Sequence, residues 1–94
     1  AEFNARSWRI PSKHQDYRYS LALHGVGMAD EWPVVPLHVD WSDRVTLGQF
    51  EPGMVLCVES LIAEAGSESI KLETQVLITE TGSERLDSFP WEDV

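Results

Sequence analysis

Residues 51–62 read Glu-Pro-Gly-Met-Val-Leu-Cys-Val-Glu-Ser-Leu-Ile, a turn signal followed by a nearly continuous apolar run. Adjacent proline and glycine favour a tight turn, and the run over 54–62 predicts a strand that is covered on both faces. Its one charged residue is Glu59. Because a buried carboxylate without partners is strongly unfavourable, we expect Glu59 to meet a cation or strong hydrogen-bond donors.

Further strands are predicted on either side of this run. Residues 70–79 alternate with period two and carry Glu73 on the more polar face, and residues 63–69 predict the hairpin loop between the two strands. Residues 17–23 also alternate, which predicts a strand leading into His24. Shorter strands are predicted over 44–47 and 84–86, and a helix only in the first few residues. The chain is therefore expected to be α+β and mostly antiparallel sheet.

Composition limits the classes of function. A chain of 94 residues with 43% hydrophobic side chains is long enough for one small domain. The net charge of −9 argues against binding to nucleic acids or to anionic membranes, and no apolar run is long enough to span a bilayer. One cysteine, Cys57, excludes an intrachain disulfide, and its apolar surroundings predict a buried, inert thiol. We expect a cytoplasmic protein whose natural N-terminus lies further upstream.

The stretch from His24 to Pro33 gathers a good metal ligand, two carboxylates and two glycines into ten residues. Neighbouring antiparallel strands bring opposing side chains to within about 5 Å. If the predicted strands are adjacent, His24, Glu59 and Glu73 converge, and such a mixed set of nitrogen and oxygen donors suits Zn, Mn, Fe or Co. On the residues alone, a structural role for the histidine remains the commoner alternative. The valine pair between Pro33 and Pro36 predicts an extended connection.

Four motifs in order resemble the C-terminal part of the pita-bread metalloenzyme superfamily, which includes methionine aminopeptidase, aminopeptidase P, prolidase and creatinase. The resemblance covers residues 17–90. The motifs are His-Gly-x-Gly at 24–27, Asp-Glu-Trp-Pro at 30–33, Glu-Pro-Gly-Met-Val-Leu-Cys-Val-Glu at 51–59 and Ile-Lys-Leu-Glu-x-Gln-Val-Leu-Ile-Thr-Glu-x-Gly at 70–82. The resemblance implies that the chain is a C-terminal portion of a pita-bread fold.

The resemblance also implies a site for two divalent ions (Mn, Zn, Fe or Co) held by two aspartates, one histidine and two glutamates. His24, Glu59 and Glu73 match the histidine and the two glutamates. The two aspartates belong upstream, so residues 1–94 are expected to be a partial catalytic domain. By itself this fragment is expected to bind metal weakly, if at all, and to be inactive.

Asp30 separates two functions that the resemblance leaves open. The peptidases usually carry a histidine there that donates hydrogen bonds to substrate, whereas an ionised aspartate accepts them. The superfamily as a whole favours an Xaa-Pro peptidase-like hydrolase that uses metal-activated water. The alternative is the branch that cleaves dimethylsulfoniopropionate, a carbon–sulfur lyase with Asp30 as general base and Tyr19 in the substrate pocket.

The remaining expectations concern the substrate and the partners. Glu31 and Trp32 are further candidates for substrate binding, Trp32 because the face of a tryptophan attracts a cationic substrate. The substrate is expected to be a small molecule or a short peptide. A third hypothesis is a truncated, non-catalytic fragment whose sheet edges and apolar faces pair with another chain. We therefore expect a homodimer or a higher oligomer.

Overall fold

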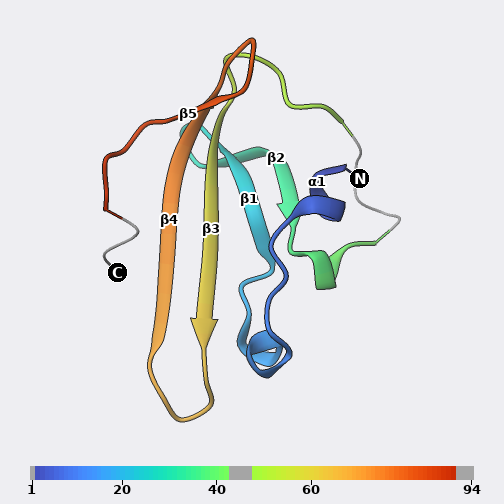
Figure 1. Ribbon diagram of the computed structural model, residues 1–94, viewed down its shortest axis with the longest axis vertical. Helices are drawn as coiled ribbons and strands as arrows, with labels where there is room; N and C mark the ends of the chain where they lie inside the picture. Colours follow the sequence, from blue (N-terminus) through green and yellow to red (C-terminus); the bar gives the residue numbers. More distant parts are fainter. Residues whose placement is uncertain (1, 43–47, 91–94) are drawn as a thin grey trace.

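The computed structural model describes residues 2–42 and 48–90, which form a five-stranded antiparallel sheet with strand order β2-β1-β3-β4-β5 (Figure 1). The strands are β1 (Leu21–Val26), β2 (Asp30–Pro36), β3 (Val55–Ala63), β4 (Ser69–Ile78) and β5 (Ser83–Arg85). Helix α1 (Glu2–Arg6) and the 3-10 helices η1 (Ser12–Tyr17) and η2 (His38–Asp40) are short. Within the described ranges no helix has the length and hydropathy needed to cross a membrane. The pita-bread assignment stays a prediction, and the strand predicted at 44–47 lies outside the described residues.

Strands β3 and β4 form a long hairpin that reaches beyond the rest of the sheet (Figure 1). Their bounds lie within one residue of the predicted strands over 54–62 and 70–79, which confirms both. The connection turns at Gly66, whose φ of 67° lies in the left-handed region that favours glycine. The short strand predicted at 84–86 is found one residue earlier, as β5.

The prediction of a strand over 17–23 is wrong in its bounds, because β1 begins only at Leu21. Tyr17 is instead the last residue of the 3-10 helix η1. This helix begins with a hydrogen bond from the His14 amide to the Pro11 carbonyl. The aromatic side chain of Tyr17 is half exposed, so its place in the alternation does not reflect a buried sheet face. As a result His24 lies inside β1 and is buried between β2 and β3.

Strand β2 occupies the segment that was expected to be only an extended connection. It forms the sheet edge beside β1, where an unpaired side tolerates Pro33 and Pro36, which lack a backbone N–H. Gly25 makes this pairing possible, because a Cβ atom at that position would lie 2.4 Å from the Trp32 carbonyl oxygen. Gly25 therefore serves by leaving space for the neighbouring backbone.

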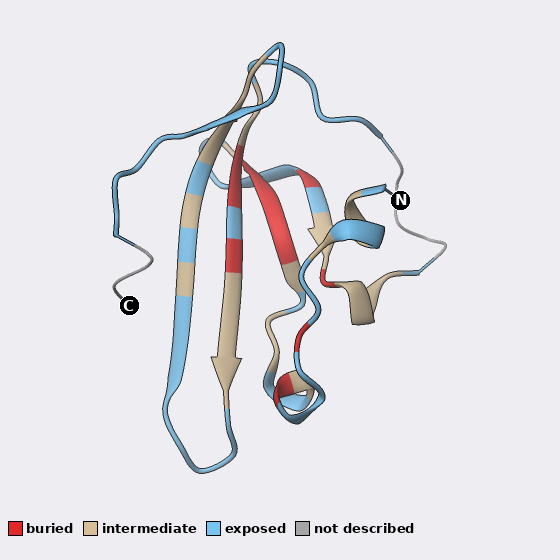
Figure 2. Cartoon of the chain, in the orientation of Figure 1, coloured by how far each residue is buried: buried red, intermediate tan, exposed pale blue. Residues whose placement is uncertain are grey.

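The hydrophobic core is small. Ile10, Ala22 and Leu37 form a buried cluster against which Phe3 and Val39 pack. Figure 2 shows most of the other buried positions on β1 and the adjoining part of β3, and His14 of η1 and Pro33 of β2 are buried as well. The expectation that β3 is covered on both faces is wrong at Val58, which is 37% exposed beside an apolar pocket of about 430 Å³. Burial is therefore concentrated around β1 and the start of β3.

Candidate metal centre

The three predicted metal ligands lie on one side of the sheet in three adjacent strands. His24 on β1 faces Cys57 on β3, and Glu59 on β3 faces Glu73 on β4. Because side chains alternate along a strand, Cys57 and Glu59 point to the same side. The pocket at this position has a volume of about 310 Å³, and its lining includes these residues together with Tyr19, Asp30 and Lys71. The register of β1, β3 and β4 therefore assembles the cluster.

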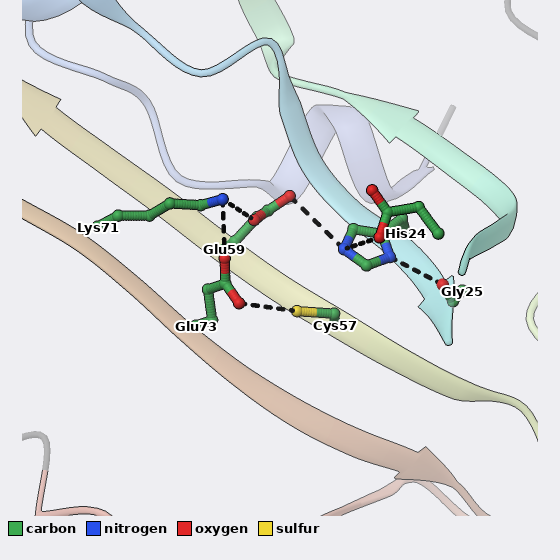
Figure 3. Close-up of polar contacts among 7 residues, drawn as sticks. His24, Gly25, Cys57, Glu59, Lys71 and Glu73 are labelled. Atoms are coloured by element: carbon green, nitrogen blue, oxygen red, sulfur yellow. Dashed lines mark hydrogen bonds and ion pairs between the residues drawn. The ribbon is translucent and has the colours of Figure 1, made fainter. Parts of the chain in front are cut away.

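The ring of His24 is oriented for metal binding. Its Nδ1 lies 2.8 Å from the carbonyl oxygen of Gly25. A carbonyl only accepts hydrogen bonds, so Nδ1 carries a proton, and in the neutral ring Nε2 presents a lone pair. Nε2 lies 3.7 Å from Glu59 Oε1 (Figure 3) and 3.6 Å from Asp30 Oδ1, and both distances exceed that of a hydrogen bond. A lone pair and two carboxylate oxygens thus face a common space, which suits a cation.

Glu59 provides an independent indication of a cation site. Its side chain is 1% exposed, and Oε1 has no hydrogen-bond partner among the described residues. The other oxygen, Oε2, accepts a hydrogen bond from Lys71 Nζ at 3.0 Å. The prediction that Glu59 meets a cation is thus confirmed for Oε2. The unpartnered Oε1 and the His24 lone pair fit one divalent ion.

Lys71 contacts both glutamates, and it was not predicted from the sequence to be a site residue. Its ammonium group lies 2.8 Å from Glu73 Oε1 as well as 3.0 Å from Glu59 Oε2, and it sits 4.4 Å from the centre of the Tyr19 ring. The hydrogen bond from Lys71 lowers the pKa of Glu73, and the two carboxylates raise the pKa of Lys71. The only sequence signal was that Lys71 and Glu73 share one face of β4. The lysine neutralises much of the carboxylate pair.

The four residues proposed to meet substrate take different positions. Asp30 opens β2 with its side chain 69% exposed, and it borders the pocket together with Tyr19. Glu31 instead lies over Gly27, where an added Cβ would be 2.7 Å from its Cγ. Trp32 packs near Gly48. Neither Glu31 nor Trp32 is among the pocket-lining residues that the structure describes, and their role in substrate binding stays a prediction.

Cys57 is buried, as predicted, but its neighbourhood was not foreseen. Its Sγ lies 3.9 Å from Glu73 Oε2, and the donor atoms of His24, Cys57 and Glu59 all lie within 4.8 Å of one another. Burial, followed by the charges of Glu73 and Glu59, raises the pKa of the thiol. The spacing of Cys57 and Glu59, two residues apart on one strand, was the signal that could have placed both at the site.

Comparison with known proteins indicates which lineage the chain resembles. No family model matches it. It is 46% identical over 96 residues to dimethylsulfoniopropionate lyase DddP from Roseovarius nubinhibens and 45% identical to DddP from Roseobacter denitrificans, in each case across 97% of this chain. The chain spans 21% of the length of each relative. It is thus homologous to a segment of these lyases, which supports the lyase alternative more than the peptidase.

Proposed function

We propose that the chain is part of a metal-dependent carbon–sulfur lyase that cleaves dimethylsulfoniopropionate to acrylate and dimethyl sulfide. One observation carries the proposal. In a chain 46% identical to a dimethylsulfoniopropionate lyase, Asp30 Oδ1 lies 3.6 Å from Nε2 of the candidate ligand His24. A carboxylate in this position can take a proton from carbon. The whole activity belongs to a longer protein, of which this chain supplies one portion.

The residues present account for part of the metal site. His24 Nε2 and Glu59 Oε1 would hold one divalent ion, and Glu73 is the remaining ligand that the resemblance implies. A second ion needs further donors, which the resemblance places upstream as two aspartates. When bound, the ions supply positive charge that holds the substrate carboxylate and makes the neighbouring C–H bond more acidic.

Asp30 acts as the base in this proposal. Its carboxylate takes the proton from the carbon next to the substrate carboxylate, and the electron pair of that C–H bond forms the carbon–carbon double bond. The C–S bond breaks as this double bond forms, with its electrons moving to sulfur, so the sulfonium leaves as neutral dimethyl sulfide and acrylate remains. Because the Asp30 side chain is 69% exposed, the proton can pass from it to solvent.

Tyr19 is suited to the cationic end of the substrate. The face of its ring already carries the Lys71 ammonium at 4.4 Å from the ring centre. Aromatic faces attract cations through their electron-rich surface, and a sulfonium is a cation of similar charge. We infer that the face of Tyr19 that Lys71 does not occupy holds the sulfonium while Asp30, which lines the same pocket, reaches the adjacent carbon chain.

The test uses the full-length parent protein with dimethylsulfoniopropionate and an Ala-Pro dipeptide in parallel, each with Mn²⁺ or Zn²⁺ and with chelator. Gas chromatography should detect dimethyl sulfide only when metal is present. Asp30→Asn should lower this rate by about 100-fold or more, whereas the exposed Asp16→Asn variant should match the wild type. Release of proline without dimethyl sulfide would instead establish the peptidase.

A further inference from the structure

We propose that Cys57 is a metal ligand, and that His24, Cys57 and Glu59 together bind one borderline-soft divalent ion such as Zn²⁺ or Co²⁺. The proposal rests on the proposed function in so far as His24 and Glu59 are ligands there too. It adds a sulfur donor that the resemblance does not assign. It also makes the 94 residues sufficient for one metal ion, contrary to the expectation that the fragment binds metal weakly.

The backbone register places the three donors together. His24 and Cys57 are direct partners across β1 and β3, and Glu59 follows Cys57 by two residues on the same face of β3. Their donor atoms lie within 4.8 Å of one another, and all three residues are buried. Zinc bonds to nitrogen, oxygen and sulfur are about 2.0–2.3 Å long, so modest side-chain rotations bring the three donors onto one ion.

A second observation points to the same space. Glu59 Oε1 is buried without a hydrogen-bond partner among the described residues, and it lies 3.7 Å from His24 Nε2. In the neutral ring that nitrogen presents a lone pair, because Nδ1 donates to the Gly25 carbonyl. An acceptor oxygen and an acceptor nitrogen do not satisfy each other. A cation between them would satisfy both.

The contacts made by Lys71 explain why Cys57, and not Glu73, would be the ligand beside Glu59. Glu73 Oε1 and Glu59 Oε2 are both occupied by Lys71, at 2.8 and 3.0 Å. The thiol of Cys57 donates toward Glu73 Oε2 at 3.9 Å. When an ion binds, the S–H bond breaks, its electron pair goes to the metal, and the proton leaves by way of the Glu73 carboxylate to solvent. The ion gains a thiolate while Lys71 keeps its place.

This donor set determines the metal preference. Thiolate and imidazole favour Zn²⁺ and Co²⁺, whereas a site of carboxylates and water suits Mn²⁺ and Mg²⁺. The chain should therefore bind Zn²⁺ more tightly than Mn²⁺. The replacement of Cys57 by serine should reduce that preference, because a hydroxyl is a harder and weaker ligand.

The experiment is a titration of the 94-residue chain with Co²⁺ under anaerobic conditions, followed by absorption spectroscopy. We expect visible bands from the metal and a near-ultraviolet band from sulfur-to-cobalt charge transfer. Cys57 is the only cysteine in the sequence, so such a band can arise from no other residue. Cys57→Ser should lose the near-ultraviolet band and keep weaker visible bands. Glu59→Gln should weaken binding, whereas Glu64→Gln, which removes an exposed carboxylate on the β3–β4 loop, should not.

Each outcome decides the proposal. Visible cobalt bands without charge transfer in the wild-type chain would overturn Cys57 as a ligand and leave the roles of His24 and Glu59 in the proposed function intact. Failure of the wild-type chain to bind Co²⁺ would also overturn the inference, while the lyase is decided separately by dimethyl sulfide release from the full-length protein. The wild-type spectrum alone is decisive if Cys57→Ser does not fold, as judged by circular dichroism.

Discussion

Glu59 lies directly opposite Glu73 in the antiparallel register of β3 and β4. Like charges that face each other across a strand pair repel, and here the ammonium of Lys71 contacts both carboxylates within 3.0 Å. The lysine thus supplies positive charge at a place where the resemblance expects divalent metal. The stability of the metal-free chain should depend on it.

Replacement of Lys71 by Met should destabilise the chain in chelator. The change leaves the buried Glu59 without its hydrogen-bond donor, and because Lys71 is itself 40% exposed the expected loss is about 1–3 kcal/mol. Urea denaturation followed by circular dichroism measures it. Mn²⁺ or Zn²⁺ should recover part of the loss, because a divalent ion offsets the same carboxylates.

Lys13→Met is the matched control for that variant. Lys13 pairs with Glu64 at 4.0 Å, and both side chains are more than half exposed. Such a surface pair contributes less than about 1 kcal/mol, so the control should unfold close to the wild-type midpoint in chelator. Equal loss in both variants would mean that Lys71 has no special role between the glutamates.

Zinc should raise the stability of the wild-type chain through His24. An ion that binds only the folded state at 100 times its dissociation constant adds about 2.7 kcal/mol. His24→Ala should abolish this increment. His14→Gln is the control, because His14 is another buried histidine, which contacts the Ala63 carbonyl outside the pocket. This variant should keep the gain in stability on zinc binding even if its stability without zinc falls. Thermal unfolding with zinc and with chelator gives both values.

Gly25→Ala should disrupt the pairing of β1 with β2. The added Cβ would lie 2.4 Å from the Trp32 carbonyl oxygen, which is backbone and cannot rotate away. We expect a loss of about 3 kcal/mol in the free energy of unfolding. Gly82→Ala is the control, because in the described part of the chain nothing lies within 4 Å of its added Cβ. A Gly25→Ala variant as stable as Gly82→Ala would contradict the close approach of these strands.

The pairing of Arg18 with Asp40 should make stability depend on pH. The guanidinium donates two hydrogen bonds, at 2.6 and 2.8 Å, and these lower the pKa of Asp40. A carboxyl whose folded pKa is below its unfolded value of about 3.9 stabilises the fold above that pH. Asp40→Asn should therefore cost about 1–2 kcal/mol at pH 7. The gap to wild type should close as pH falls below about 4, in urea denaturation repeated across pH 3–7.

Local sequence was enough to predict the long hairpin but not the sheet around it. The apolar run over 54–62 and the alternation over 70–79 stand on either side of turn residues, so β3 and β4 follow from short-range pattern. The start of β1 was misplaced because the period-two signal began with Tyr17, which belongs to η1. β2 was missed because two prolines argue against a strand unless it lies at an edge, and edge position is set by the whole sheet.

The candidate site was predictable in its members but not in its internal contacts. His24, Glu59 and Glu73 line one pocket because neighbouring strands bring them together. The contacts of Lys71 and Cys57 depend on strand register, and a shift of one residue moves every side chain to the other face. The linear pattern indicates which residues of one strand share a face, but it does not state which residues of the neighbouring strand lie opposite them. The positions of Lys71 and Cys57 therefore became visible only in three dimensions.

The hairpin that aligns Glu59 with Glu73 also determines where the chain can change length. The last residue pair of β3 and β4 is Ala63 with Ser69, and Gly66 lies in the exposed connection beyond it. Extra residues inserted at Gly66 therefore leave the pairing of the two strands unchanged. A single deletion between Cys57 and Glu59 would instead turn one of them to the opposite face. The hairpin end is thus a permissive site for inserted peptides or tags, whereas a change of length between Cys57 and Glu59 would separate the candidate ligands.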